Sequence, residues 1–176
     1  MPFILALLAI AGGALFWLTR ARNAAEVTSE LADAAATVLG AARRFSFRHQ
    51  ANRHPVDCIE DPKIAIGGLA TAFLELDAFP TADQKQRLHF ALQSVLKLPL
   101  SEAEELVILG HWFVTQCGGA SPAVSRLARR LNRLNGVEGL TRSLAVVQAM
   151  ATPNTGGLTT QQTEALDEIR RIFRIT

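Results

Sequence analysis

An uncharged apolar run at the N-terminus constrains this chain more than any other feature. Residues 1–19 contain no charged side chain, and Arg20 and Arg22 follow the run directly. A helix of about 20 apolar residues spans the hydrocarbon core of a membrane. A secretory signal peptide has the opposite order, with basic residues before the apolar core and small residues at its cleavage site. We therefore expect residues 1–22 to be a retained transmembrane anchor, with a signal peptide or a buried helix as the alternatives.

The position of these arginines also predicts how the anchor is oriented. Basic residues flank membrane spans on the cytoplasmic side. We therefore expect a single-pass protein of a bacterial-type inner membrane, with its N-terminus outside and the rest of the chain in the cytoplasm. The two cysteines, Cys58 and Cys117, lie far apart in the sequence, and unpaired thiols are typical of that reducing compartment.

The rest of the chain has the composition of an all-α protein. Tyr is absent and aromatic residues make up only 6% of the sequence, whereas strands are enriched in aromatic and β-branched residues. Apolar residues recur at spacings of three and four between turn signals, as on the buried face of a helix. About seven helices are expected after the anchor, over residues 24–44, 62–77, 81–97, 101–117, 121–134, 137–151 and 159–172. They divide into a juxtamembrane amphipathic helix and loop (23–61) and a compact helical domain (62–176).

Capping signals mark several of the expected helix ends. Asp61, followed by Pro62, has the residue types that begin a helix. A Ser or Thr with Gln or Glu three residues later forms a capping box, which satisfies free backbone N–H groups at a helix start. The chain has three such patterns: Thr81-x-x-Gln84, Ser101-x-x-Glu104 and Thr159-x-x-Gln162. Gly118 and Gly136 are expected to end the helices that precede them.

Two turns in the chain share one pattern. LDAFPTADQ at residues 76–84 and TGGLTTQQ at 155–162 each lead from a turn into Thr-x-x-Gln and an amphipathic helix. Over about residues 60–175, this pattern resembles the tellurite-resistance B-like (TerB-like) family. Together with the expected anchor, it resembles the arrangement of DjlA-type co-chaperones, although no His-Pro-Asp loop of a J domain occurs here. The resemblance implies an all-helical TerB-like domain.

The resemblance also implies a place for a weakly bound divalent cation. Acidic residues of the family pattern are thought of as metal-binding, and Asp77 and Asp83 are the candidates in this chain. Gln84 and Gln162 stand where the family has Glu, and a neutral amide is a poor ligand for a hard divalent cation. The simpler interpretation is that Asp77 and Asp83 stabilise a helix N-terminus. No other cofactor is expected.

Four arginines form the clearest polar feature of the chain. Arg126, Arg129, Arg130 and Arg133 have the spacing of one helix face, opposite a face of apolar residues. We call these four residues the arginine face. It predicts a binding surface for an acidic protein partner or for anionic lipid headgroups, and the simpler interpretation is a solvated surface. Nucleic acid is not expected, because no aromatic platform or recognition motif accompanies the arginines.

Catalytic motifs are missing from the sequence. His89, His111 and Cys117 lack the pattern of an oriented catalytic pair, and the His, Cys and carboxylates of residues 54–61 lack a regular metal-ligand spacing. The sequence therefore predicts a non-enzymatic, membrane-anchored interaction module. It would recruit or stabilise a protein partner, either as an accessory subunit of a membrane complex or in envelope stress. The alternative is a divalent-metal-binding or metalloid-stress-responsive domain. We also expect Phe45 and Phe47 to dock the 45–61 loop, since they would otherwise form an exposed apolar patch.

Overall fold

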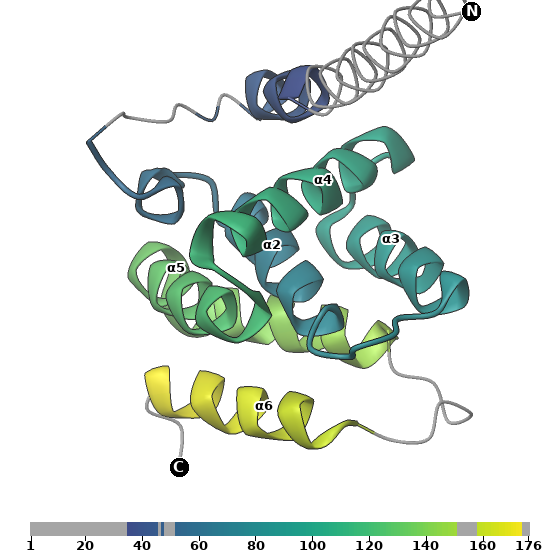
Figure 1. The fold of residues 1–176 in the computed structure, drawn as a ribbon, viewed down its shortest axis with the longest axis vertical. Helices are drawn as coiled ribbons and strands as arrows, with labels where there is room; N and C mark the ends of the chain where they lie inside the picture. Colours follow the sequence, from purple (N-terminus) through teal and green to yellow (C-terminus); the bar gives the residue numbers. More distant parts are fainter. Residues whose placement is uncertain (1–34, 46, 48–51, 151–157, 174–176) are drawn as a thin grey trace, which may run out of the picture. The chain divides into compact units, whose positions relative to one another are not determined.

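The computed structural model describes residues 35–45, 47, 52–150 and 158–173. Residues 1–37 and 38–176 form separate units, and the helices described below belong to the second unit apart from the first residues of a helix over 35–44. The labelled elements are the 3-10 helix η1 (Pro55–Cys58) and the helices α2 (Pro62–Leu74), α3 (Ala82–Leu96), α4 (Leu100–Cys117), α5 (Ala120–Met150) and α6 (Thr160–Ile172) (Figure 1). None of the described residues forms a strand, so the all-α prediction is confirmed for them.

The predicted membrane anchor, residues 1–22, lies outside the described residues. Among the helices that are described, none combines the length and the apolar character that crossing a membrane requires. The anchor and its orientation therefore stay predictions.

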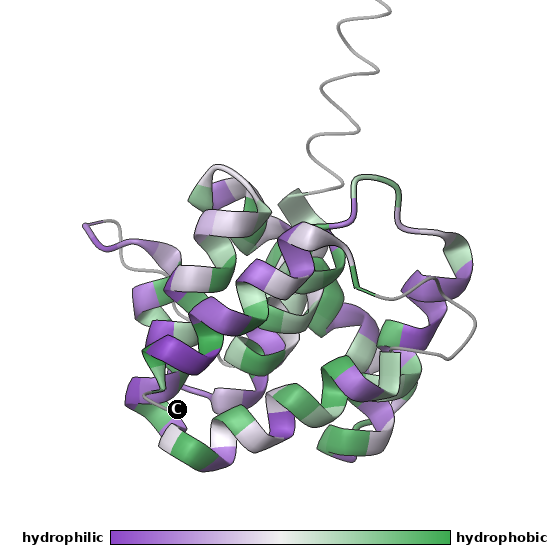
Figure 2. Cartoon of the chain, turned by 90° about the horizontal axis from the view of Figure 1, so that it is seen from below, coloured by the Kyte–Doolittle hydropathy of each residue, from purple (hydrophilic) through white to green (hydrophobic). Residues whose placement is uncertain are grey.

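Helix α2 is the central element of the array (Figure 1). Every residue from Ile64 to Leu74 is buried, and α2 packs against both α4 and α5. The surrounding helices carry hydrophilic residues between their hydrophobic ones (Figure 2), as amphipathic helices around a shared core do. Each fully buried Leu or Ile side chain contributes about 1.5–3 kcal/mol relative to exposure, so the burial of α2 on all sides stabilises the domain substantially.

Helices α2 and α4 approach each other closely at one point. The Thr71 hydroxyl donates a hydrogen bond to the Gly67 carbonyl on its own helix (2.9 Å) and lies against Gly110 of α4. A Cβ on Gly110 would come within 2.4 Å of the Thr71 Oγ1 and 2.5 Å of its Cβ. Only glycine fits at this position without moving the two helices apart.

We expect G110A to lower the free energy of unfolding by about 1–3 kcal/mol, because the cost of overpacking exceeds the gain in helix propensity. Gly40 is the matched control, since a Cβ built there meets no described atom within 4 Å apart from its chain neighbours and its own helix backbone. G40A should leave stability unchanged or raise it by up to about 1 kcal/mol. Urea unfolding followed by far-UV circular dichroism measures both. Equal stabilities of the two variants would contradict the close approach of α2 and α4.

Most of the predicted helix ends are confirmed. The Asp61 side chain accepts from the Lys63 N–H (2.8 Å) at the start of α2. Both Thr-x-x-Gln patterns form complete capping boxes at the starts of α3 and α6. Gly118 ends α4 with a φ of 78°. The predicted helices 121–134 and 137–151 are the two halves of α5, which is kinked at Gly136. There, a φ of 48° favours glycine, which lacks a Cβ.

The capping box predicted at Ser101 is wrong. Helix α4 begins at Leu100, one residue earlier, with Pro99 in the capping position and no side-chain cap. The Pro99 carbonyl accepts the N–H groups of Glu102 and Ala103, each at 3.1 Å. Ser101 consequently lies inside the first turn, where its hydroxyl accepts from the Arg44 guanidinium (3.4 Å) instead of capping the backbone.

This difference predicts unequal effects of three equivalent substitutions. T81A and T159A each remove a capping hydrogen bond to a backbone N–H and should cost about 1 kcal/mol of stability. S101A removes no cap and should change stability by less than about 0.5 kcal/mol. The same urea titration compares the three variants, and a cost for S101A as large as for T81A would contradict this assignment.

The expected docking of Phe47 is confirmed. Its ring meets those of Trp112 and Phe113 edge-on, with ring centroids 5.9 and 5.6 Å apart. Phe45 also packs against the core, and Arg44 pairs with Glu105 of α4 at 3.1 Å. Phe47 and Arg44 therefore attach to α4 by apolar and polar contacts respectively.

Candidate functional site

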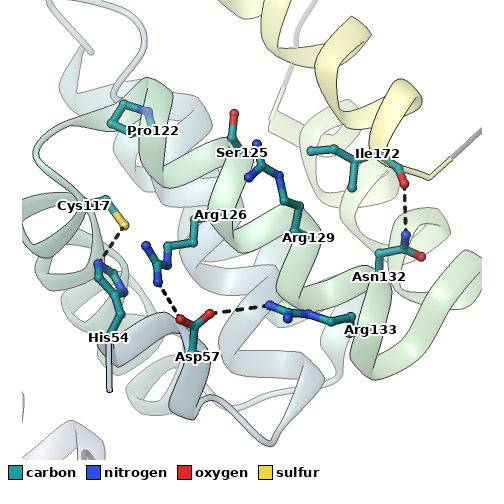
Figure 3. A pocket seen from close by; sticks show the side chains of 10 residues that line it. All are labelled: His54, Asp57, Cys117, Pro122, Ser125, Arg126, Arg129, Asn132, Arg133 and Ile172. Carbon is teal, nitrogen blue, oxygen red and sulfur yellow. Dashed lines mark hydrogen bonds and ion pairs between the residues drawn. The ribbon is translucent and has the colours of Figure 1, made fainter. Parts of the chain in front are cut away.

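A pocket of about 1030 Å³ opens between the segment containing η1 and the first half of α5 (Figure 3). Its polar lining includes His54, Asp57, Arg126, Arg129, Asn132 and Arg133. Cys117 lies at the His54 side and Ile172 of α6 at the Asn132 side. We call it the arginine pocket.

The amphipathic character of α5 explains why its arginines line this pocket. Leu127 and Leu131 are fully buried against the core, so residues on the opposite side of the helix face outward. On the facing segment, Val56 within η1 and Ile59 directly after it are also fully buried, which fixes this short helix against the domain. Asp57 then points toward the arginines of α5 (Figure 3).

Asp57 bridges two of these arginines. Its Oδ2 accepts from Arg126 Nη2 at 2.5 Å, and its Oδ1 lies 3.5 Å from Arg133 Nη2. Burial by itself raises the pKa of the Asp57 carboxyl, but the hydrogen bond and charge of Arg126 and the charge of Arg133 outweigh it. The net effect is a pKa below the ordinary value of 3.8, so the carboxyl is ionised at neutral pH.

The four residues of the arginine face have different roles in the structure. Arg130 donates from both Nε (2.7 Å) and Nη2 to the Ile59 carbonyl, so it holds the η1 segment and does not line the pocket. Arg129 lines the pocket with 63% of its side chain exposed, and its ion pair with Glu168 is long, at 3.9 Å. Three of the four predicted residues are therefore brought together around one cavity, and the fourth attaches one of its walls.

The sequence did not predict that Asp57 would join the arginines. Asp57 is 69 residues from Arg126 and 76 from Arg133 along the chain. The sequence signal that was present is the carboxylate-rich segment 54–61, but its pattern indicates only a helix cap at Asp61 and gives no partner for Asp57. Their pairing with α5 depends on how η1 packs.

His54 and Cys117 meet at the edge of the pocket. The His54 Nδ1 accepts from the Val56 N–H (3.3 Å), which leaves the proton of a neutral imidazole on Nε2. That atom lies 3.3 Å from the Gln116 carbonyl oxygen and 4.0 Å from the Cys117 sulfur. Burial raises the pKa of the Cys117 thiol, Arg126 opposes this change and Asp57 adds to it. The thiol is therefore protonated at neutral pH, and the nucleophilic thiolate is disfavoured.

Asp77 and Asp83 each have partners in α3 or in the loop before it. Asp77 Oδ1 accepts from the Phe79 N–H (3.2 Å) and Oδ2 from the Gln84 side chain (3.3 Å). Asp83 pairs with Arg87. Among the residues that the structure describes, no three His, Cys, Asp or Glu side chains are grouped so that they could hold a metal ion. The cation site at Asp77 and Asp83 stays a prediction.

Comparison with known proteins returned no relative: no protein-family model, no curated protein and no solved structure matches this chain. The TerB-like resemblance consequently rests on the two turns at residues 76–84 and 155–162 alone.

The bridge at Asp57 makes stability depend on pH. Because the folded state lowers the pKa of this carboxyl, folding disfavours its protonation. Its contribution to stability is complete above the unfolded pKa and is lost as pH falls through the folded pKa. We expect the stability difference between wild type and D57N to be constant between about pH 7 and 5 and to shrink as the pH falls below the ordinary carboxyl pKa of 3.8. Urea unfolding at each pH measures it, and a difference that does not shrink on acidification would contradict the bridge.

Proposed function

We propose that this chain is a non-enzymatic, membrane-anchored interaction module that recruits a protein partner through the arginine pocket. The observation that carries the proposal is the convergence of Arg126, Arg129 and Arg133 on one cavity, where Asp57 is the one acidic side chain among the described lining residues. Three guanidinium groups against one carboxylate leave the pocket positively charged. Guanidinium groups form paired, charge-assisted hydrogen bonds with acidic groups.

The shape of the site supports a protein partner over lipid headgroups. The arginines project from a rigid helix into a concave site whose other walls are η1 and α6 (Figure 3). A defined cavity with fixed donors suits a particular acidic group, whereas general attraction to a membrane surface needs only exposed basic residues. Headgroup binding remains the second interpretation of the same charges.

The proposal places the domain on the cytoplasmic side of a bacterial-type inner membrane, anchored by residues 1–22 with the N-terminus outside. In that position, it acts as an accessory subunit of a membrane complex or in envelope stress, with a TerB-like domain as the scaffold. The buried core around α2 and the closely packed helices support a scaffold role, because they hold the pocket residues in fixed positions.

The test is a quantitative purification of the tagged full-length protein in mild detergent. A partner retained in constant ratio by wild type should be lost from R129Q and R133Q. The matched control is R142Q, because Arg142 lies on the same helix and pairs with Glu138 (2.6 Å) outside the pocket. A partner retained equally by all four proteins, or one lost from R142Q as well, would overturn the assignment to this pocket. Recovery of the protein alone would argue against a stable partner.

A further inference from the structure

Asp57 occupies the arginine pocket in the way that a ligand would. It contacts Arg126 through one carboxylate oxygen and Arg133 through the other. The two guanidinium groups, seven residues apart on α5, are thus already spaced to hold one carboxylate between them. The position of Asp57 therefore shows that a carboxylate fits between Arg126 and Arg133.

The pocket retains donors that Asp57 does not use. Arg129 lies between Arg126 and Arg133 in sequence and is mostly exposed, and its ion pair with Glu168 is long, at 3.9 Å. Glu168 is closer to Arg171 (2.5 Å) on its own helix. Because each guanidinium has five N–H donors in a fixed plane, Arg129 is well placed to bind an incoming acidic group first.

The bridge formed by Asp57 is also weak enough to exchange. A third of the Asp57 side chain is exposed, and the two arginines are more exposed still. Ion pairs in such partly exposed positions contribute little net free energy. When a carboxylate of a ligand displaces the Asp57 side chain from the arginines, one ion pair is exchanged for a similar one. The η1 segment stays attached to α5 meanwhile, because Arg130 still donates to the Ile59 carbonyl.

We infer that the arginine pocket binds a carboxylate-rich segment of a protein partner, with Arg129 as its first contact and Asp57 as an internal competitor for Arg126 and Arg133. This inference rests on the proposed function, since it names the chemistry by which the same pocket recognises its partner. Asp57 lowers the affinity for weakly acidic segments, so that only a segment with several carboxylates displaces it.

The test is the binding of a fluorescent hexaglutamate peptide to the full-length protein in mild detergent, followed by anisotropy. R129Q should weaken binding about tenfold, the effect of removing one charge-assisted contact. D57N should strengthen binding severalfold, because it removes the competing charge. R142Q is the control for R129Q, since each removes one positive charge, and E138Q is the control for D57N, since each removes one negative charge. Arg142 and Glu138 pair with each other on α5 outside the pocket, so both controls should leave the affinity within about twofold.

Several outcomes would overturn the inference. Equal affinities of R129Q and R142Q would show that only net charge matters, and equal affinities of D57N and E138Q would show that Asp57 does not compete. Displacement of the peptide by inorganic phosphate at lower concentration than by glutarate would assign the pocket to phosphate groups instead. Binding of anionic vesicles that is stronger than binding of the peptide, and that is lost in R129Q, would assign the pocket to lipid headgroups. If D57N does not fold, D57S provides the same charge removal, and R129Q decides the carboxylate assignment by itself because its side chain is exposed.

These results separate the inference from the proposed function. Peptide binding that depends on Arg129 without a co-purifying partner would uphold the pocket chemistry and contradict the recruitment of a stable partner. A partner retained through Arg129 and Arg133 together with an unbound peptide would uphold recruitment and contradict the carboxylate assignment.

Discussion

Helix α2 has no side that faces solvent: its residues from Ile64 to Leu74 are all buried. A helix that is apolar all round must be covered on every side, and the other elements are arranged to do this. Helices α4 and α5 pack directly against it. The glycine at position 110 allows α4 to approach the Thr71 side chain closely. Because α5 must turn Leu127 and Leu131 toward this core, its arginines face away from it.

The arginine pocket follows from that packing together with the anchoring of one short segment. Val56 and Ile59 are buried, and Arg130 holds the Ile59 carbonyl, so η1 lies against the outward face of α5. Asp57, between the two buried residues, meets Arg126 and Arg133. The same contacts that attach the segment therefore create a cavity whose described lining includes Asp57 and three arginines. Charge is concentrated there because α5 supplies arginines on successive turns while η1 supplies a single carboxylate.

The sequence predicted helix starts correctly where the capping residues bond only to near neighbours in the chain. Thr81 with Gln84 and Thr159 with Gln162 form capping boxes whose partners are three residues apart, so no distant contact is needed. Ser101 has the same local pattern, but Pro99 with its extended backbone takes the capping position and Arg44, 57 residues away, takes the serine hydroxyl. At this helix start, the position of Pro99 and the contact with Arg44 outweighed the preference of Ser101 for the capping position.

Local patterns in the sequence predicted the all-α class, most helix boundaries, a helix break at Gly136 and the common face of the four arginines. These properties depend on backbone preferences and on the 3.6-residue period of the helix, which operate between near neighbours. The contacts between distant segments could not be predicted in this way: Arg130 donates to the Ile59 carbonyl, Asp57 bridges Arg126 and Arg133, and His54 lies beside Cys117. Those contacts join residues more than 60 positions apart, and they form because burial of the apolar residues around them brings the two segments together.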